Sequence, residues 1–316
     1  MTQKQIPPLL KPMERVGNVS SEVKSGQGFT YEDYVAASYL VGLLTETTAP
    51  GLDGRAVLRV ELQQGSFGRP LDDVVVWARR PDGSDASADF QIKTGLVVSA
   101  AESNDDFRET VQRAYQTLLK PDFQQNIDRV GAIVGSISDD ARRDFQALCE
   151  MARDEAETSK LVIKLQTPGT AGKKAVQFDA VKAILKPHIE ATALDEAAHL
   201  LLSHFVLVRM EMVSEGAIDE ARSIATLSAA LHAEERDRAT DLWKHLLGLA
   251  RPAQGRSAGY DRRRLVAKLR GAFRLDAAPS FRQAMAAIRT EAQLACSEIP
   301  NQIAQVTIPR HALAQE

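Results

Sequence analysis

The sequence has little cysteine and no long hydrophobic run. Its only two cysteines, Cys149 and Cys296, lie far apart and have no His or Cys neighbour at metal-ligand spacing. They exclude a disulfide framework and indicate reduced thiols in a cytoplasmic protein. No run of about 18 uninterrupted apolar residues occurs, and residues 1–17 lack the apolar core of a signal peptide. Neither export nor membrane insertion is expected.

The sequence also has no large excess of acidic or of basic residues. The formal net charge of the 316 residues is -3 and the sequence pI is about 6.1. The whole chain therefore has no general attraction to nucleic acid, and any such contact needs a local basic surface. A hydrophobic content of 44% is enough for a real core in one large domain or two ordinary ones.

Several familiar site motifs are absent. Residues 168–174, PGTAGKK, fail the spacing of a phosphate-binding loop and indicate a flexible loop instead. No Ser-His-Asp order or nucleophile elbow occurs. Zinc is not expected, because no two of the histidines stand four residues apart on a helix with a third ligand in view. The histidines are His188, His199, His204, His232, His245 and His311.

The first half of the chain predicts an α/β fold. Thr30 is the expected N-cap of a helix that ends near Thr45, and residues 56–63, 73–79 and 88–98 have strand patterns. A turn at residues 81–83 makes the last two strands a hairpin. A helix over 105–119 and a buried strand over 129–137 follow. We expect one mixed sheet with helices packed against it.

The second half predicts mainly helices. Residues 1–28 are expected to be a flexible arm, residues 29–165 an α/β domain, and residues 175–300 a helix-rich connector or assembly region. One further strand is predicted over 203–213, and residues 251–261 indicate a linker or long turn. The helices are predicted over 139–157, 178–186, 189–202, 218–232, 235–250, 259–273 and 279–298.

Polar side chains stand at the ends of two neighbouring predicted strands, where burial of such groups is costly. Gln91 and Lys93 share one face of a strand because they are two residues apart. Asp73 begins the hairpin partner and can lie beside them. Oxygens of Asp73, the Gln91 side chain and the Ile92 backbone are suitable ligands for Mg²⁺. Lys93 would then stay free to orient or help deprotonate the attacking water and to offset charge on a phosphate.

These residues carry a resemblance. "DD" before a hydrophobic strand, followed after a hairpin by hydrophobic-Gln-hydrophobic-Lys, resembles the PD-(D/E)XK restriction-endonuclease-like superfamily in its Q-x-K branch. Residues 26–44, GQGFTYEDYVAASYLVGLL, are similar to the first helix of nuclease domains in bacterial antiphage proteins, both CBASS effectors and STAND NTPase defence proteins. Residues 230–275 are similar to the connector that follows those nucleases.

The resemblance implies a restriction-endonuclease-like fold and a metal-dependent endodeoxyribonuclease. Asp73, Gln91, Lys93 and Glu32 would be its catalytic residues, and Asp73, Gln91, Glu32 and the Ile92 carbonyl its ligands for Mg²⁺ or Mn²⁺. Its substrate would be double-stranded DNA, cut with little sequence specificity. The implied role is that of an antiphage effector, a homo-oligomer controlled by a STAND NTPase or cyclic-nucleotide sensor in the same or another chain.

Each of these residues also has another possible role, and the chain another possible function. A shift of one residue in strand register would turn Asp72, rather than Asp73, towards the site. Asp72 and Asp73 can also form a turn, Lys93 can protect an edge strand, and Glu32 can simply favour its helix dipole. The rival function is a nuclease-like fold that does not cut and serves as an interaction or oligomerisation module.

Two groups of basic residues are candidate contacts to a phosphate backbone. The run from Arg251 to Arg274 is one, although such runs are commonly the solvated face of an amphipathic helix. Residues closer to the predicted site are the better candidates for guiding DNA. They are Arg79, Arg80, Arg108, Arg113 and Lys120.

Overall fold

The computed structural model describes residues 7–10, 29–52, 54–80, 82–169, 172–212 and 217–276. Its internal contacts divide the chain into two units, Met1–Asp276 and Ala277–Glu316. The described residues all belong to the first unit. The predicted helix over 279–298 and most of the predicted arm lie outside the described residues.

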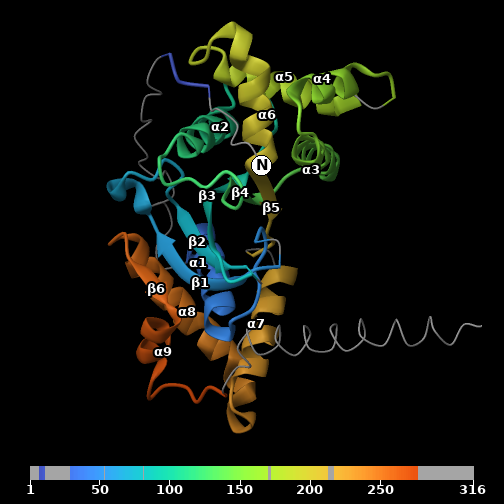
Figure 1. The fold of residues 1–316 in the computed structure, drawn as a ribbon. Helices are drawn as coiled ribbons and strands as arrows, with labels where there is room; N and C mark the ends of the chain where they lie inside the picture. The colour runs from blue at the N-terminus through green and yellow to red at the C-terminus, as the bar shows by residue number, and fades with distance from the viewer. Residues whose placement is uncertain are drawn as a thin grey trace, which may run out of the picture. The chain divides into compact units, whose positions relative to one another are not determined.

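A mixed six-stranded sheet forms the centre of the first unit (Figure 1). The strand order is β5-β4-β3-β2-β1-β6, with β3, β4 and β5 parallel to one another and the remaining pairs antiparallel. Runs of Val, Ile and Ala build the central strands, since both of their faces are covered. The strands are β1 (Ala56–Leu62), β2 (Val74–Arg79), β3 (Asp85–Gly95), β4 (Arg129–Ser136), β5 (Phe205–Arg209) and β6 (Gly259–Asp261).

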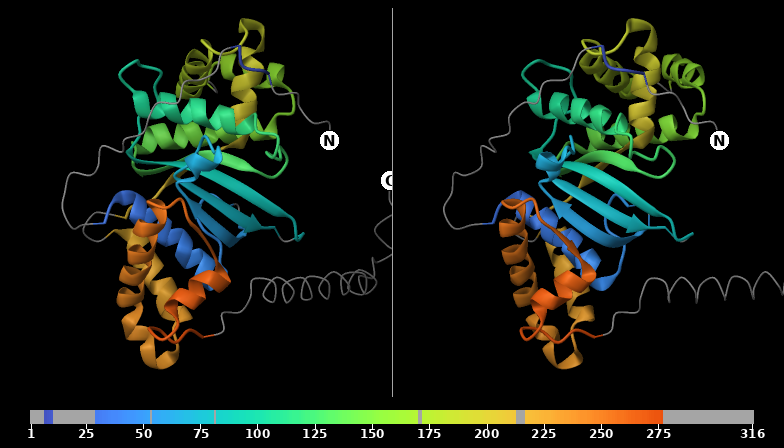
Figure 2. Two further views of the ribbon diagram at one scale, coloured as in Figure 1. Left: turned by 90° about the vertical axis from the view of Figure 1, so that its left-hand side faces the viewer. Right: turned by 60° about the vertical axis from the view of Figure 1, so that its left-hand side comes forward.

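Helices cover the two faces of this sheet as separate layers (Figure 2). One layer contains α1 (Tyr31–Thr45), α7 (Ile218–Ala230), α8 (Ala239–Gln254) and α9 (Arg262–Leu269). The other contains α2 (Asp105–Leu118), α3 (Asp139–Asp154), α4 (Thr158–Gln166), α5 (Gly172–Leu185) and α6 (Leu194–His204). Alternate residues of the strands point to opposite layers, so each layer has its own apolar core. Three short 3-10 helices complete the unit: η1 (Gln64–Phe67), η2 (Ala191–Ala193) and η3 (Ala233–Arg238).

Helix α1 fixes the position of the chain that precedes β1. Thr30 and Asp33 form a capping box, in which each side chain accepts a hydrogen bond from the backbone of the other. Most of the helix is buried, and the Tyr39 ring stacks on Phe90 of β3 with 6.1 Å between ring centroids. The predicted N-cap and helix are therefore confirmed, and the first turn of α1 is held at the end of the sheet.

The predicted α/β class with one mixed sheet is confirmed, whereas several boundaries differ. Residues 259–261 form β6, and α9 begins only at Arg262, because pairing with β1 overrides a short local helix pattern. Helix α4 was not predicted, and the predicted helix over 235–250 begins at Ala239. β5 pairs with β4, so one sheet crosses the division predicted between residues 165 and 175. The finer restriction-endonuclease-like fold stays a prediction. No described helix is long and apolar enough to span a membrane.

Candidate functional site

Strand β3 carries a row of polar side chains on the face that α2 covers. Ala88, Phe90 and Ile92 point into the apolar core beneath α1. Asp89, Gln91 and Lys93 alternate with them and therefore point to the other face. In the β2–β3 ladder Val75 is opposite Asp89, so Asp73 lies opposite Gln91. The register thus places Asp73, not Asp72, beside the predicted Gln-x-Lys residues.

Asp73 and Gln91 are in direct contact. The Gln91 side-chain amide and the Ile92 backbone N–H both donate to Oδ2 of Asp73, the latter over 2.7 Å. Only 4% of Asp73 and 1% of Gln91 is exposed. Three of the residues predicted for the site therefore meet at the end of the β2–β3 hairpin.

Glu32 reaches the same place through Gln63, a residue that the sequence did not indicate. The Gln63 side-chain amide donates to Oε2 of Glu32 over 3.3 Å and to Oδ1 of Asp73 over 3.4 Å. Gln63 adopts a left-handed backbone conformation immediately before η1, which turns its side chain back over the start of β2. One amide thus lies between two carboxylates.

Burial and neighbouring charge change the proton affinity of this acid. Desolvation is the largest cause that raises the pKa of Asp73, and the Glu32 charge adds to it, while the Ile92 N–H and Lys93 act in the opposite direction. The resulting pKa is about 8. Asp73 is therefore largely protonated in the folded protein at neutral pH.

Lys93 is held by two carboxylates of α2. Its Nζ lies 2.9 Å from Asp106 and 3.2 Å from Glu109. Burial lowers the pKa of Lys93, but the hydrogen bonds and charges of Asp106 and Glu109 outweigh burial, so its pKa is raised. A permanently charged ammonium can offset negative charge, but it cannot accept a proton from water at neutral pH.

Arg113 links the remaining charged groups. One of its nitrogens, Nη1, lies 2.7 Å from Asp72 and donates to Oε1 of Gln91 over 3.3 Å, and the other, Nη2, lies 2.7 Å from Glu109. Burial raises the pKa of Asp72, although Arg113 opposes it. Glu109 and Arg113 are four residues apart and therefore lie on one face of α2. This spacing of an acid and a base is visible in the sequence and could have indicated Glu109.

The residues predicted to guide DNA are mostly engaged elsewhere. Arg113 belongs to the network just described, with only 14% of its side chain exposed. Arg79 pairs with Asp85 across the hairpin at 2.6 Å, and Arg108 donates to the Ala100 carbonyl. Lys120 donates to the Gly68 carbonyl. Arg80 lies 3.8 Å from Asp82, so each of the five predicted residues has a partner within the protein.

The oxygen atoms of the predicted metal ligands are arranged to fit a small divalent cation at only one place, between Asp73 and Glu32. Asp73 and Glu32 present carboxylate oxygens to the single Gln63 amide, which is the group that a cation would replace. Gln91 turns its amide NH₂ to Asp73 and its oxygen to Arg113. Across the part of the chain that the structure describes, no three His, Cys, Asp or Glu side chains form a cluster able to hold a metal ion.

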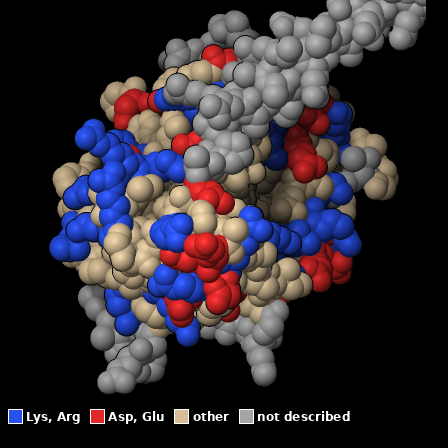
Figure 3. Space-filling model, turned by 90° about the horizontal axis from the view of Figure 1, so that it is seen from below, with Lys and Arg blue, Asp and Glu red and all other residues tan. Residues whose placement is uncertain are grey.

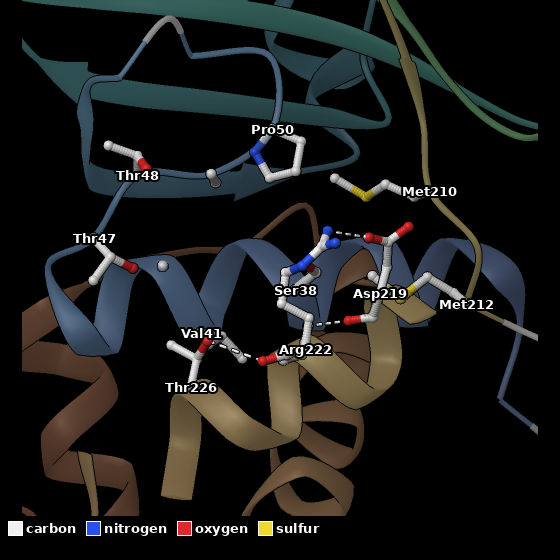
Figure 4. Close-up of a pocket in the computed structure, with 13 residues that line it drawn as sticks. Ser38, Val41, Thr47, Thr48, Pro50, Met210, Met212, Asp219, Arg222 and Thr226 are labelled. Carbon is white, nitrogen blue, oxygen red and sulfur yellow. Dashed lines mark hydrogen bonds and ion pairs between the residues drawn. The ribbon is translucent and has the colours of Figure 1, made fainter. Parts of the chain in front are cut away.

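A separate pocket of about 80 Å³ lies against α1 (Figure 4). It lies between α1, the loop over residues 47–50, the segment after β5 and the first turns of α7. Arg222 pairs with Asp219 at 2.7 Å along one wall, and Met210 and Met212 form another. None of the predicted site residues lines this pocket.

The chain matches no protein-family model and no curated protein sequence. Among solved structures it is similar to an Acinetobacter baumannii Cap4 SAVED/CARF-domain containing receptor with the cyclic trinucleotide 2'3'3'-cAAA, at 11% identity and a TM-score of 0.44. The match covers 78% of this chain and 44% of that one. The Moraxella osloensis Cap4 receptor gives 14% identity, coverage of 77% and 48%, and a TM-score of 0.40. The chain thus spans less than half of the length of these receptors.

These names correct two expectations from the sequence. The similar structures are SAVED/CARF-domain containing receptors, and none of those reported is named a nuclease. We therefore withdraw the resemblance to PD-(D/E)XK nucleases and the function of an antiphage effector endonuclease that followed from it. The spacing of Asp73, Gln91 and Lys93 is satisfied by a buried polar network, so the pattern alone did not specify a nuclease.

Proposed function

We propose that the described residues act as a non-catalytic interaction module of a receptor protein. The observation that carries this proposal is the pairing of Lys93 with both Asp106 and Glu109. With Arg113 bound to Asp72 and Glu109, the cations at the end of the hairpin are neutralised from within. Such a network fixes α2 against β3 and raises the pKa of Lys93, so that Lys93 does not act as a base beside Asp73. For the receptor as a whole, a cyclic oligonucleotide is the proposed signal, as named for one Acinetobacter structure.

The first test is a search for phosphodiester cleavage. Supercoiled plasmid incubated with the native chain and Mg²⁺ or Mn²⁺ should stay intact, as it should with EDTA, because Lys93 and Asp73 are committed to internal partners. Lys93→Ala should behave in the same way. Nicking by the native chain that requires the metal and is lost in Lys93→Ala would overturn the non-catalytic proposal. Hydrolysis by this chain stays a prediction until that experiment.

Binding of Mg²⁺ by Asp73 and Glu32 is a second proposal. It is supported by the Gln63 amide, which lies between the two carboxyl groups at 3.3 Å from Glu32 and 3.4 Å from Asp73. Excess Mg²⁺ is expected to raise the melting temperature of the native chain by several degrees, because a ligand at 100 times its Kd adds about 2.7 kcal/mol. Asp73→Asn should abolish the shift. An equal shift in both proteins would place the cation elsewhere.

A further inference from the structure

The end of α8 and the whole of α9 concentrate positive charge in a chain that is acidic overall. Residues 251–270 include seven Lys and Arg residues and one acid, whereas the chain has a net charge of -3. Six of the seven are exposed: Arg251, Arg256, Arg263, Arg264, Lys268 and Arg270. We call these six residues the basic surface. Figure 3 shows Lys and Arg gathered along the left-hand side of the face seen from below, the side on which Figure 1 places α9.

Most of this charge is not neutralised. Arg251 pairs with Asp33, and the less exposed Arg262 pairs with Glu46. The other five members of the basic surface have no ion pair with any residue that the structure describes. The site around Lys93 is the opposite case, since each cation there is paired. Unpaired, exposed guanidinium groups are the usual feature of a surface that binds an external anion.

Helix α9 arranges these cations on a rigid element. Leu265 and Leu269 are fully buried against the α1 layer and fix the helix. Arg264 and Lys268 are one turn apart on one flank of that apolar stripe, and Arg263 and Arg270 are on the other. Asp261 caps the helix by accepting from the Arg264 backbone N–H over 2.7 Å. The charges therefore project as two short rows.

The composition of the surface favours one class of partner. The exposed large apolar side chains among the described residues lie elsewhere, at Leu10, Phe67, Val97, Ile163, Val176 and Ile218. Protein partners are normally held by buried apolar or aromatic anchors, which this surface lacks. Single strands are normally held by stacking on exposed aromatic rings, which it also lacks. A duplex needs only its phosphate charges to be matched, at one charge per about 1.7 Å of helix axis.

We propose that the basic surface binds the phosphate backbone of duplex DNA without reading its sequence. Guanidinium groups form paired hydrogen bonds with phosphate oxygens, which explains the excess of Arg over Lys. The loop between α8 and β6 also contacts the residues on either side of Gln63, since the Ser257 carbonyl accepts from the Gln64 side chain and the Ala258 carbonyl from the Leu62 backbone. The proposal names a partner for the interaction module and in that respect rests on the proposed function.

The test compares two variants with the same change in net charge. One replaces Arg263, Arg264, Lys268 and Arg270 with Ser. The control replaces four lysines of the opposite layer: Lys160, Lys173 and Lys186, which are exposed, and Lys174, which is partly buried. Fluorescence anisotropy with a labelled 30-base-pair duplex, of two unrelated sequences, is recorded in EDTA from 50 to 200 mM salt. EDTA separates binding from any cleavage, so a failed plasmid test and a failed binding test can be told apart.

The native chain and the lysine control should bind both duplexes equally. The basic-surface variant should bind at least about tenfold more weakly at low salt, with a salt slope smaller in magnitude by about 3 to 4. Circular dichroism should show that the variant keeps its helical fold, because none of the four replaced side chains has an ion pair among the described residues. Arg264 alone of the four has a side-chain hydrogen bond there, to the Gly259 carbonyl over 3.1 Å. Equal loss in both variants, no binding by the native chain, tighter binding of single-stranded DNA or duplex RNA, or equal binding of poly-glutamate would each overturn the proposal.

Discussion

Replacing Gly131 with Ala is expected to lower the unfolding free energy by about 3 kcal/mol or more, the upper range for an overpacked interior. Gly131 lies in β4, between β3 and β5. An added Cβ would lie 1.9 Å from the Val206 carbonyl oxygen and 2.9 Å from the Val206 carbonyl carbon. Backbone cannot rotate away as a side chain can, so β5 must move. The melting temperature should fall by roughly 6 to 12 °C for a unit of this size.

Gly248→Ala is the matched control. Gly248 is exposed in α8, and nothing lies within 4 Å of an added Cβ. The same substitution there should stabilise the protein by about 0.5 to 1 kcal/mol, since alanine favours the helix. Urea unfolding of both variants measures the contrast. Equal stability of the two would mean that β5 does not pair with β4 in the observed register.

The second large effect is a loss of stability as the pH rises, caused by Asp73. Its ordinary pKa of 3.8 is raised to about 8 in the folded protein. Below about pH 4 Asp73 is protonated in both the folded and the unfolded protein, so its contribution to the unfolding free energy is kept. Between pH 4 and pH 8 the unfolded state ionises while the folded state keeps its proton, so the unfolding free energy falls. The full difference is of the order of 5 kcal/mol, at 1.36 kcal/mol per pKa unit.

Variants can separate Asp73 from the other buried acid on this face. The pKa of Asp89 is raised to about 6, chiefly by burial, with Arg69 opposing. In EDTA, the native protein should lose about 2 to 3 kcal/mol from pH 6 to pH 8. Asp73→Asn should be flat over that window, and Asp89→Asn should keep the slope. A native protein whose urea midpoint does not change between pH 6 and pH 8 would contradict a protonated Asp73.

Much of the fold could be predicted because local signals agreed with the final packing. Thr30 gave the start of α1, and the β-branched run before residue 79 gave β2. β6 could not be predicted, because the three residues Gly259–Asp261 are strand only through their hydrogen bonds to β1. The partner of β4 also depended on tertiary pairing, although a strand had been predicted over 203–213.

The candidate site could be predicted only in part. The period of two along β3 placed Gln91 and Lys93 together, and the hairpin brought Asp73 to them. The pattern could not reveal that Asp106 and Glu109 would hold Lys93, since those contacts join α2 to a strand 13 or more residues away. Because of those contacts, the charge of Lys93 is neutralised within the protein. The spacing of Asp73, Gln91 and Lys93 therefore suggested a catalytic function that the paired charges do not support.

The order of the strands also affects how the chain is made. The four strands in the middle of the sheet are complete once Ser136 has been synthesised, but both outer strands come later, at residues 205–209 and 259–261. At the usual speed of a ribosome, β1 and β4 wait on the order of ten seconds for their neighbours. During that time they offer open hydrogen-bonding edges to other nascent chains. A fragment that stops at residue 165 would keep both edges open permanently and should aggregate.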